Sequence, residues 1–433
     1  MMKKTVSLLT AVAACAAIAA PATKPAAKTV PMVRAERDSA VYKVGEKIKF
    51  VVTDAGEKVF YTVNNGRFTT PEALLKDNEI NVDAKEPGFV LVTLKLGKDA
   101  KGKDIVTYGG AAIEPEKIVP GTKRPADFEK FWQDEVANMR KSELEVVKKT
   151  PIDAKYLPEG FTGYDVEVRR GDVTATGYLV IPPGGKGTLG AVINFNGASK
   201  VSSELPVAIG VAKRFKAISF NLNFHGLKNV NLTRVRNRAE EAKMRPAVKN
   251  YQFNNGDDRQ AYAMRKIFLR TVLSADYLRT LPEFDGKNLI ASGGSLGGCQ
   301  AIVCAALVPE VVYCVSNATA MCDHFGKDAG HLPGWPNLFE RNPEAVKAAA
   351  YFDVVNFAPM VKCPVIMGVG FIDVTCPPAT TYAAYNVLGT TDKKMFHSIT
   401  GGHGNVLDRK RDKGVFSFGN VETQKFLRNA KKK

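Results

Sequence analysis

The sequence predicts an α/β protein in two parts: a small all-β sandwich, followed by a mostly parallel sheet flanked by helices. Three observations support this prediction. Short runs rich in β-branched and aromatic residues fill residues 34–118, a pattern typical of strands. Beyond residue 164, apolar runs of strand length alternate with helical segments, as in parallel sheets that are buried on both faces. Ser295 stands in a glycine-lined turn between one such strand and the next helix.

The first 20 residues have the pattern of an export signal. MMKK is a short basic region, and residues 5–20 are an apolar, alanine-rich stretch that is too short for a permanent membrane helix. Ala17 and Ala19 suit cleavage after Ala19, whereas VAAC (residues 12–15) resembles the motif that leaves a lipid anchor on Cys15. Both interpretations stay open. Either one predicts an exported protein, whether periplasmic, extracellular or an envelope lipoprotein.

Composition excludes several function classes. The formal net charge is +17 at pH 7, but the charges are dispersed, and export argues against a nucleic-acid partner. The six cysteines after Cys15 all lie between residues 299 and 376, with no CxxC pair and no zinc-type spacing to histidine. We therefore expect no metal site built on these cysteines, and small buried cysteines with at most one disulfide.

Residues 21–33 are rich in proline, alanine and lysine and are expected to be a flexible lead-in. The sandwich is expected over residues 34–118 and is of immunoglobulin-like type. Asn65-Gly66 predicts a hairpin, and Pro87-Gly88 predicts a turn. No residue of the sandwich suggests chemistry. An orienting role and carbohydrate binding are the two alternatives for it.

The second domain is expected over residues 119–433. It opens with a helix over residues 126–145, which Asp127 is placed to cap and whose aromatic stripe is typical of core packing. Parallel strands are predicted in LGAVINFNG, KAISFNLNFHG, NLIASGG, VVYCVSN, PVIMGVG and MFHSITGG. In such sheets the ligand site lies beyond the carboxyl ends of the strands.

The glycine-lined turn reads GGSLGG over residues 293–298 and matches the G-x-S-x-G nucleophile elbow of α/β-hydrolases. A serine hydroxyl needs a base, and His403 follows the last predicted strand, where this fold carries its histidine. His397 lies within that strand and is expected to be a half-buried strand residue. Asp373 follows PVIMGVG and is the expected acidic partner. Asp353 and Asp392 are its rivals, each with the character of a cap or turn residue.

Ester hydrolysis also needs donors for the oxyanion. The N–H of Leu296, directly after the serine, is one donor by position. The second is expected from INFNGASK (residues 193–200), at the N–H of Ala198. Asn196 in the same loop and His225, at the end of the next strand, are expected to line the pocket.

Several segments together resemble the acetyl xylan esterases that include cephalosporin-C deacetylase, within the α/β-hydrolase superfamily. PADFEKFW resembles the opening helix of that family, GGSLGG its GGSQGG elbow, and GFIDVTCPPATTYAAYN its acid-bearing segment D-x-x-C-P-P-x-T-x-x-A-x-Y-N. The resemblance covers about residues 125–430. It implies a Ser295–His403–Asp373 triad, removal of acetyl groups from xylo-oligosaccharides or related small esters, no cofactor, and a homo-oligomer if the added sandwich permits one.

This sequence departs from the family at the site. Asn196 and Ala198 replace a histidine and a tyrosine of the oxyanion loop, Phe224-His225 stand where an arginine-containing segment is usual, and Leu296 replaces a glutamine. The natural ester is therefore open. Feruloyl or glucuronoyl ester cleavage, peptide hydrolysis, and a non-catalytic carbohydrate-binding envelope protein are the alternatives.

Overall fold

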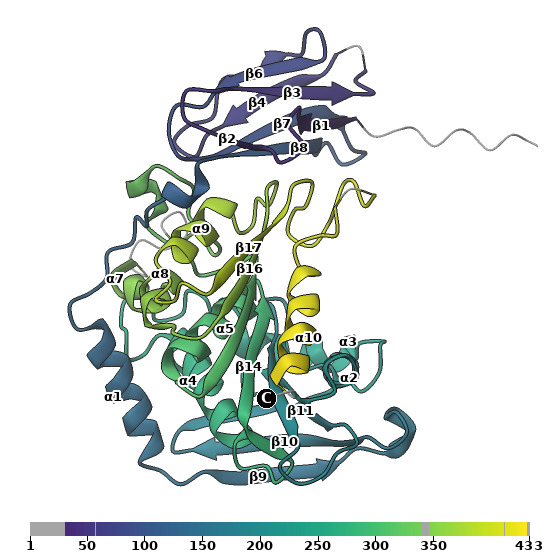
Figure 1. Ribbon diagram of the computed structural model, residues 1–433, viewed down its shortest axis with the longest axis vertical. Coiled ribbons are helices and arrows are strands. Elements are labelled where there is room, and N and C mark those ends of the chain that lie inside the picture. Colours follow the sequence, from purple (N-terminus) through teal and green to yellow (C-terminus); the bar gives the residue numbers. More distant parts are fainter. Residues whose placement is uncertain (1–30, 57, 339–345, 411, 431–433) are drawn as a thin grey trace, which may run out of the picture. The chain divides into compact units, whose positions relative to one another are not determined.

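Figure 1 presents the protein as a computed structural model, which describes residues 31–56, 58–338, 346–410 and 412–430. The expected export signal, Cys15, the cleavage site after Ala19 and all but the last three residues of the lead-in lie outside the described residues. Contacts join the described residues into one unit. Within the described residues, no helix combines the length and the apolar character of a membrane span.

The described chain begins with two small sheets, which confirm an all-β N-terminal region. One sheet has the order β1 (Met32–Ala35), β3 (Lys47–Thr53), β6 (Glu79–Asp83); the other has the order β2 (Val41–Tyr42), β8 (Asp104–Ile113), β7 (Gly88–Lys98), β4 (Phe60–Asn64), β5 (Ala73–Leu74). Along β3, Ile48, Phe50 and Val52 point into the core and alternate with more exposed residues, as a strand with one buried face requires. Strand β1 begins at Met32, so the end of the expected lead-in belongs to the sheet.

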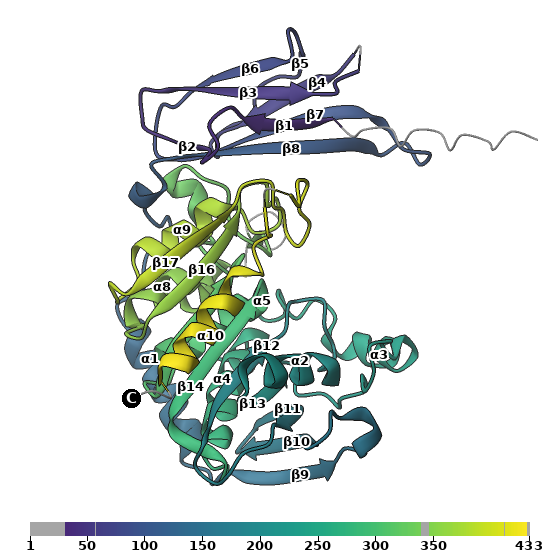
Figure 2. The same cartoon turned by 45° about the vertical axis from the view of Figure 1, so that its right-hand side comes forward.

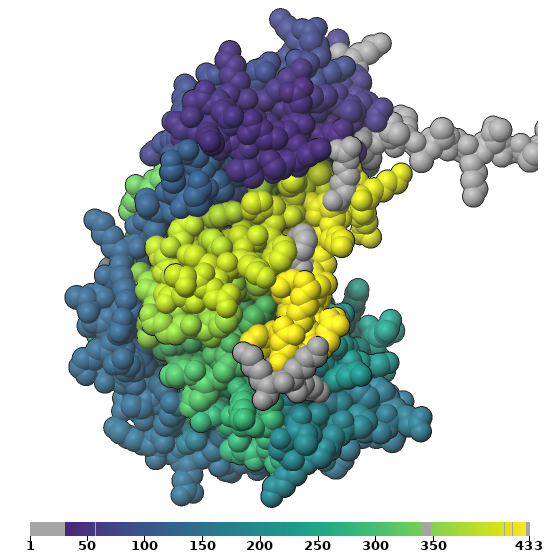
Figure 3. All heavy atoms as spheres, viewed as in Figure 1, coloured from purple at the N-terminus to yellow at the C-terminus, as the bar shows by residue number. Residues whose placement is uncertain are grey.

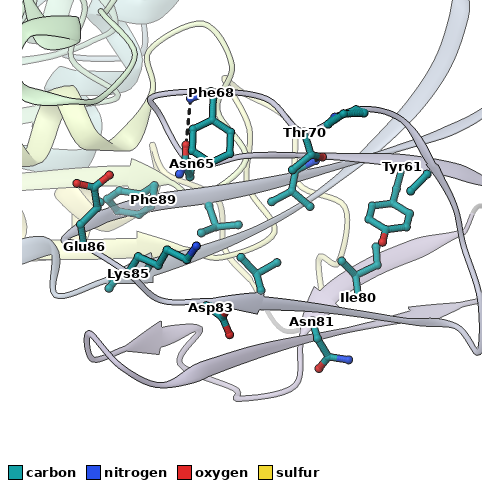
Figure 4. A pocket seen from close by; sticks show the side chains of 17 residues that line it. Tyr61, Asn65, Phe68, Thr70, Ile80, Asn81, Asp83, Lys85, Glu86 and Phe89 are labelled. Atoms are coloured by element: carbon teal, nitrogen blue, oxygen red, sulfur yellow. Dashed lines mark hydrogen bonds between the residues drawn. The ribbon is translucent and has the colours of Figure 1, made fainter.

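A cavity of about 340 Å³ opens among the strands of this region. Figure 4 shows Phe68 and Asn65 above it, Tyr61 at one end and Asp83 on β6 below. Phe68 is 58% exposed, and an exposed aromatic residue beside polar groups is compatible with carbohydrate binding. Carbohydrate binding by this region stays a prediction, as does its immunoglobulin-like type.

A larger mixed sheet follows, and the structural neighbours reported below confirm its fold class. Within the described residues nine strands have the order β17-β16-β15-β14-β12-β13-β11-β10-β9. They are β9 (Glu145–Pro151), β10 (Thr162–Arg170), β11 (Val173–Ile181), β12 (Leu189–Phe195), β13 (Ile218–Asn223), β14 (Phe284–Gly294), β15 (Val311–Asn317), β16 (Val365–Gly370) and β17 (Lys393–Ser398). Strands β12 to β17 pair in parallel, whereas β9, β10 and β11 extend the sheet antiparallel. Every residue of β13 and β16 is buried; this explains the continuous apolar character of β16, whereas β13 also buries Ser219, Asn221 and Asn223.

Helices cover both faces of this sheet. They are α1 (Phe128–Arg140), α2 (Leu205–Phe215), α3 (Arg238–Met244), α4 (Ala263–Leu278), α5 (Leu296–Leu307), α7 (Val346–Ala349), α8 (Val354–Phe357), α9 (Pro378–Asn386) and α10 (Phe418–Ala430). Short 3-10 turns are η1 (Pro115–Lys117), η2 (Ala154–Tyr156), η3 (Arg245–Val248), η4 (Gly326–Ala329), η6 (Ala350–Phe352) and η7 (Ala358–Met360). Helices α4 and α5 lie on one face and α2 and α10 on the other (Figure 2). Figure 3 shows α10, in yellow, at the surface.

Helix α1 begins at Phe128 and ends at Arg140, five residues before the predicted end. Its aromatic stripe is core, as expected, because Phe128 and Trp132 are fully buried. Asp127 occupies the N-cap position but makes no capping hydrogen bond. Its carboxylate instead pairs with Arg259 at 2.7 Å, so tertiary contacts replace the predicted local one.

Asp353 is a structural carboxylate at the start of helix α8. It accepts hydrogen bonds from the N–H groups of Val355 (3.0 Å), His324 (2.6 Å) and Asp323 (2.7 Å), and from the hydroxyl of Thr122 (2.7 Å). This rival of Asp373 is therefore a cap, as its sequence context suggests. It ties the segment before α1 to the loops beyond the sheet.

Burial, and then the charge of Asp323, raise the pKa of Asp353 to about 7. An acid whose pKa is higher in the folded state stabilises the fold most below its unfolded pKa, and this contribution is lost as the pH rises through the folded value. We expect Asp353→Asn to lower the free energy of unfolding by about 1–3 kcal/mol at pH 4, because the amide cannot accept from every donor. The deficit should shrink between pH 4 and pH 7 in urea melts. A constant deficit would mean that Asp353 does not titrate there.

Candidate active site

Ser295 lies at the turn between β14, which ends at Gly294, and α5, which begins at Leu296. Its backbone has φ 58° and ψ −125°, a strained conformation for a residue with a side chain. Close packing maintains this turn. A Cβ at Gly293 would lie 2.2 Å from the carbonyl oxygen of Gly297, and a Cβ at Gly297 would lie 2.3 Å from that of Phe195. Only glycine fits both positions, so the glycines of the motif are required by contact.

Ser295, His403 and Asp373 form a continuous hydrogen-bonded chain. The hydroxyl of Ser295 lies 2.9 Å from Nε2 of His403, and Nδ1 of His403 lies 2.8 Å from Oδ2 of Asp373. The other oxygen of Asp373 accepts from the N–H groups of Thr375 (2.8 Å) and Cys376 (2.9 Å). Because an ionised carboxylate only accepts, Nδ1 carries the imidazole proton. Nε2 is then free to accept from the serine hydroxyl.

The sheet explains why three residues so distant in sequence meet. Ser295 follows β14, Asp373 follows β16 and His403 follows β17, and these parallel strands end at the same edge. The rejected alternatives lie apart from this chain. His397 is a half-buried residue of β17 whose Nε2 lies 2.5 Å from the hydroxyl of Tyr382, and Asp392 is exposed just before that strand.

The loop after β12, residues 196–200, is called the oxyanion loop below. A Cβ at Gly197 would lie 3.8 Å from Cβ of Ser295, so the loop passes directly beside the serine. The N–H of Ala198 donates to no described residue. The N–H of Leu296 belongs to the first turn of α5, where no helical acceptor exists. Both predicted donors are therefore placed beside Ser295 with unused capacity.

The side chain of Asn196 braces the oxyanion loop, and its place in the wall of the pocket stays a prediction. Its Nδ2 donates to the carbonyl oxygen of Leu222 at 2.9 Å, which directs the side chain toward β13. The backbone carbonyl oxygen of Asn196 accepts a hydrogen bond from Nε2 of Gln300 on α5 at 3.2 Å. The same nitrogen of Gln300 also donates to the backbone carbonyl oxygen of Leu296. Sequence reasoning missed Gln300. The one signal for it was a polar residue within the apolar run CQAIVCAALV.

His225 lies on the other side of the oxyanion loop, where it lines a cavity together with Ala198. Its ring packs against Phe224 at 4.1 Å and edge-on against Tyr251 at 4.7 Å, between ring centroids. The Tyr251 hydroxyl donates to the carbonyl oxygen of Ala198 at 3.3 Å. Burial, and then the charge of Arg270, lower the pKa of His225 to about 3, so this imidazole is neutral at physiological pH.

Metal-ligating side chains and cysteines are the remaining candidates for chemistry. Among the described residues, no three His, Cys, Asp or Glu side chains gather as metal ligands would. The six cysteines in the described part of the chain are all free, and only Cys363 is not fully buried, which confirms the small-buried-residue interpretation. Phe416 was not predicted; its ring would collide with a Cβ at Gly294 and lies edge-on to His403, 6.3 Å away.

The family model for acetyl xylan esterase (AXE1) matches residues 115–327 and 336–419, which is more than half of the sequence. The chain belongs to the acetyl xylan esterase family. It is therefore a serine ester hydrolase, and the family resemblance drawn from the sequence is confirmed. The match begins after β8, so the two small N-terminal sheets lie outside it.

Individual relatives of this esterase agree. Acetyl esterase Axe7A of Xylanibacter ruminicola is 30% identical over 397 residues, covering 83% of each chain. The solved acetyl xylan esterase from Paenibacillus sp. R4 is 19% identical with a TM-score of 0.58, covering 73% of this chain and 98% of that one. Acetyl xylan esterase 1 from Thermoanaerobacterium sp. JW/SL YS485 is 22% identical with a TM-score of 0.56, covering 73% and 97%. The two structures establish the α/β-hydrolase fold.

Proposed function

We propose that this esterase is exported and releases acetate from acetylated xylo-oligosaccharides or related small acetyl esters, through a Ser295–His403–Asp373 triad and a covalent acyl-enzyme. The observation that supports the proposal is the unbroken hydrogen-bonded chain from the Ser295 hydroxyl to Asp373. Family membership supports the acetyl ester as substrate. The sequence of residues 1–20 supports export, with cleavage after Ala19 or lipidation of Cys15 as the two routes.

In the proposed first step, Oγ of Ser295 attacks the acetyl carbonyl carbon while its proton passes to Nε2 of His403. The negative charge that develops on the carbonyl oxygen is bound by the N–H groups of Leu296 and Ala198. The bond to the sugar oxygen then breaks, and the departing hydroxyl takes the proton from Nε2. Asp373 stabilises the imidazolium throughout and remains ionised.

The second step returns the serine. Nε2 of His403 takes a proton from water, whose oxygen attacks the acetyl-serine carbon at the same oxyanion site. The bond from the acetyl carbon to Oγ of Ser295 breaks, the serine regains its proton from the histidine, and acetate leaves. Each turnover consumes one water and releases one sugar hydroxyl and one acetic acid, which ionises to acetate and a proton. No step needs a metal or an organic cofactor.

A fluorophosphonate probe tests the nucleophile directly, because it phosphonylates only a serine that is activated by a neighbouring base. We expect stoichiometric labelling of the full chain, with the adduct mapped to Ser295 by peptide mass spectrometry. Acetylated xylo-oligosaccharide, feruloyl and methyl-glucuronate esters and a peptide, assayed in parallel, separate acetyl esterase activity from its alternatives. Labelling at another serine, or none, would overturn the assignment of Ser295.

A further inference from the structure

A cavity of about 550 Å³ beside the oxyanion loop has no part in the steps above. Ala198 belongs to its wall, and the preceding Gly197 lies next to Ser295. The outer wall consists of residues of the segment 242–252, which covers the last turn of α3 and the chain after it. A hollow of this size, one residue of whose wall belongs to the oxyanion loop, is large enough for a sugar ring and its substituents.

The cavity is positively charged. Arg245 and Lys249 line it, and no aspartate or glutamate does. Lys249 forms no ion pair with a described residue. Arg245 reaches only Glu241, at 3.9 Å, and that carboxylate already pairs with Arg236 at 2.7 Å. A ligand in the cavity therefore meets two cations whose charge the surrounding protein leaves largely uncompensated.

His225 lines the same cavity and carries an unmet hydrogen-bonding group. The residue is only 9% exposed, and its Nε2 is buried without a hydrogen-bond partner among the described residues. Buried polar atoms are nearly always hydrogen-bonded, so an unpartnered one calls for an explanation. Packing against Tyr251 explains the position of the ring but not the unpartnered nitrogen. A ligand hydroxyl or carbonyl reaching the imidazole would supply the missing partner.

We propose that this cavity is a substrate subsite for a sugar that bears a carboxylate, a uronic acid residue of the acetylated oligosaccharide. The carboxylate would lie between Arg245 and Lys249, and ring hydroxyls would lie against His225 and Tyr251. The inference rests on the proposed function, since it takes the acetyl group to react at Ser295 while the acidic sugar occupies the cavity. It names acidic, acetylated xylo-oligosaccharides as the preferred substrates.

Binding of unacetylated saccharides tests this subsite without relying on catalysis. Calorimetry on the full chain at low ionic strength would compare a neutral xylo-oligosaccharide with one of equal length that carries a glucuronic acid branch. We expect the acidic saccharide to bind about tenfold more tightly, and this advantage to fall as salt is added, because exposed cations are screened.

Two double variants distinguish the cavity from the general charge of the protein. Arg245→Gln with Lys249→Gln should remove the acidic preference, bringing the two dissociation constants together. Arg234→Gln with Arg238→Gln removes the same charge from exposed positions before and at the start of α3 that do not line the cavity and should keep the preference. Equal binding of both saccharides by the unmodified protein, or the same loss in both double variants, would overturn the proposal.

A third variant tests the imidazole. His225→Phe keeps an aromatic ring but removes both nitrogens, so we expect binding of both saccharides to weaken several-fold; unchanged binding would remove His225 from the subsite. Hydrolysis of p-nitrophenyl acetate, which carries no sugar, is measured alongside on the unmodified protein. Failure to hydrolyse it would contradict the proposed function, whereas the binding results would still decide the subsite.

Discussion

Ser295→Ala is expected to reduce kcat for p-nitrophenyl acetate and for acetylated xylo-oligosaccharides by at least about 10⁴-fold, with little change in KM. The reason is that alanine leaves no group for the acyl-enzyme, while the oxyanion donors and the rest of the pocket remain. Alanine also keeps the Cβ, so the strained backbone at φ 58° is no worse accommodated than with serine. Initial rates and a thermal melt of the same preparation measure the two effects separately.

The matched control is Ser39→Ala, which removes an exposed serine hydroxyl far along the chain from the elbow. Its rates should equal those of the unmodified protein. If Ser295→Ala kept more than about a hundredth of the activity, the triad assignment would be wrong, because no other described hydroxyl pairs with His403.

The elbow was predictable because its signal is local. A serine between glycines, after an apolar strand and before a helix, already implies a backbone turn that only glycine neighbours permit, and the contacts of Gly293 and Gly297 bear that out. The partners His403 and Asp373 were predictable for a different reason. Each follows a strand, and parallel strands in one sheet bring their carboxyl ends to one edge, so chain order alone brings the candidates together.

The sequence could not predict tertiary contacts that involve irregular segments, because such segments have no periodic pattern of apolar residues. Nothing near Asn196 in the sequence indicates that its side chain donates a hydrogen bond to the carbonyl oxygen of Leu222 on β13. Tyr251 lies in a polar segment, and nothing local indicates that its hydroxyl reaches the carbonyl of Ala198. The start of strand β1 was not predicted for the same reason. Its residues follow a proline-rich lead-in, and only pairing with β3, about twenty residues later, makes them a strand.

Asp373 is the second position at which a substitution tests the proposed triad. Asp373→Asn removes the negative charge of the side chain and keeps its shape. In the unmodified protein, the N–H groups of Thr375 and Cys376 both donate to Oδ1 of Asp373. In Asp373→Asn we therefore expect them to donate to the oxygen of the new amide. The amide nitrogen then faces Nδ1 of His403, which can meet it only as an acceptor. The imidazole proton moves to Nε2, where it points at Ser295 and blocks proton abstraction.

We therefore expect Asp373→Asn to lower kcat by about 10³–10⁴-fold, as a wrong histidine tautomer does in serine hydrolases, with KM and thermal stability nearly unchanged. Asp392→Asn makes the same chemical change at an exposed position before β17 and should leave the rate intact. Fluorophosphonate labelling of Ser295 should slow in parallel with kcat in the first variant, since both need the same base. A loss below about tenfold at Asp373, or an equal loss at Asp392, would mean that His403 takes its orientation from another group.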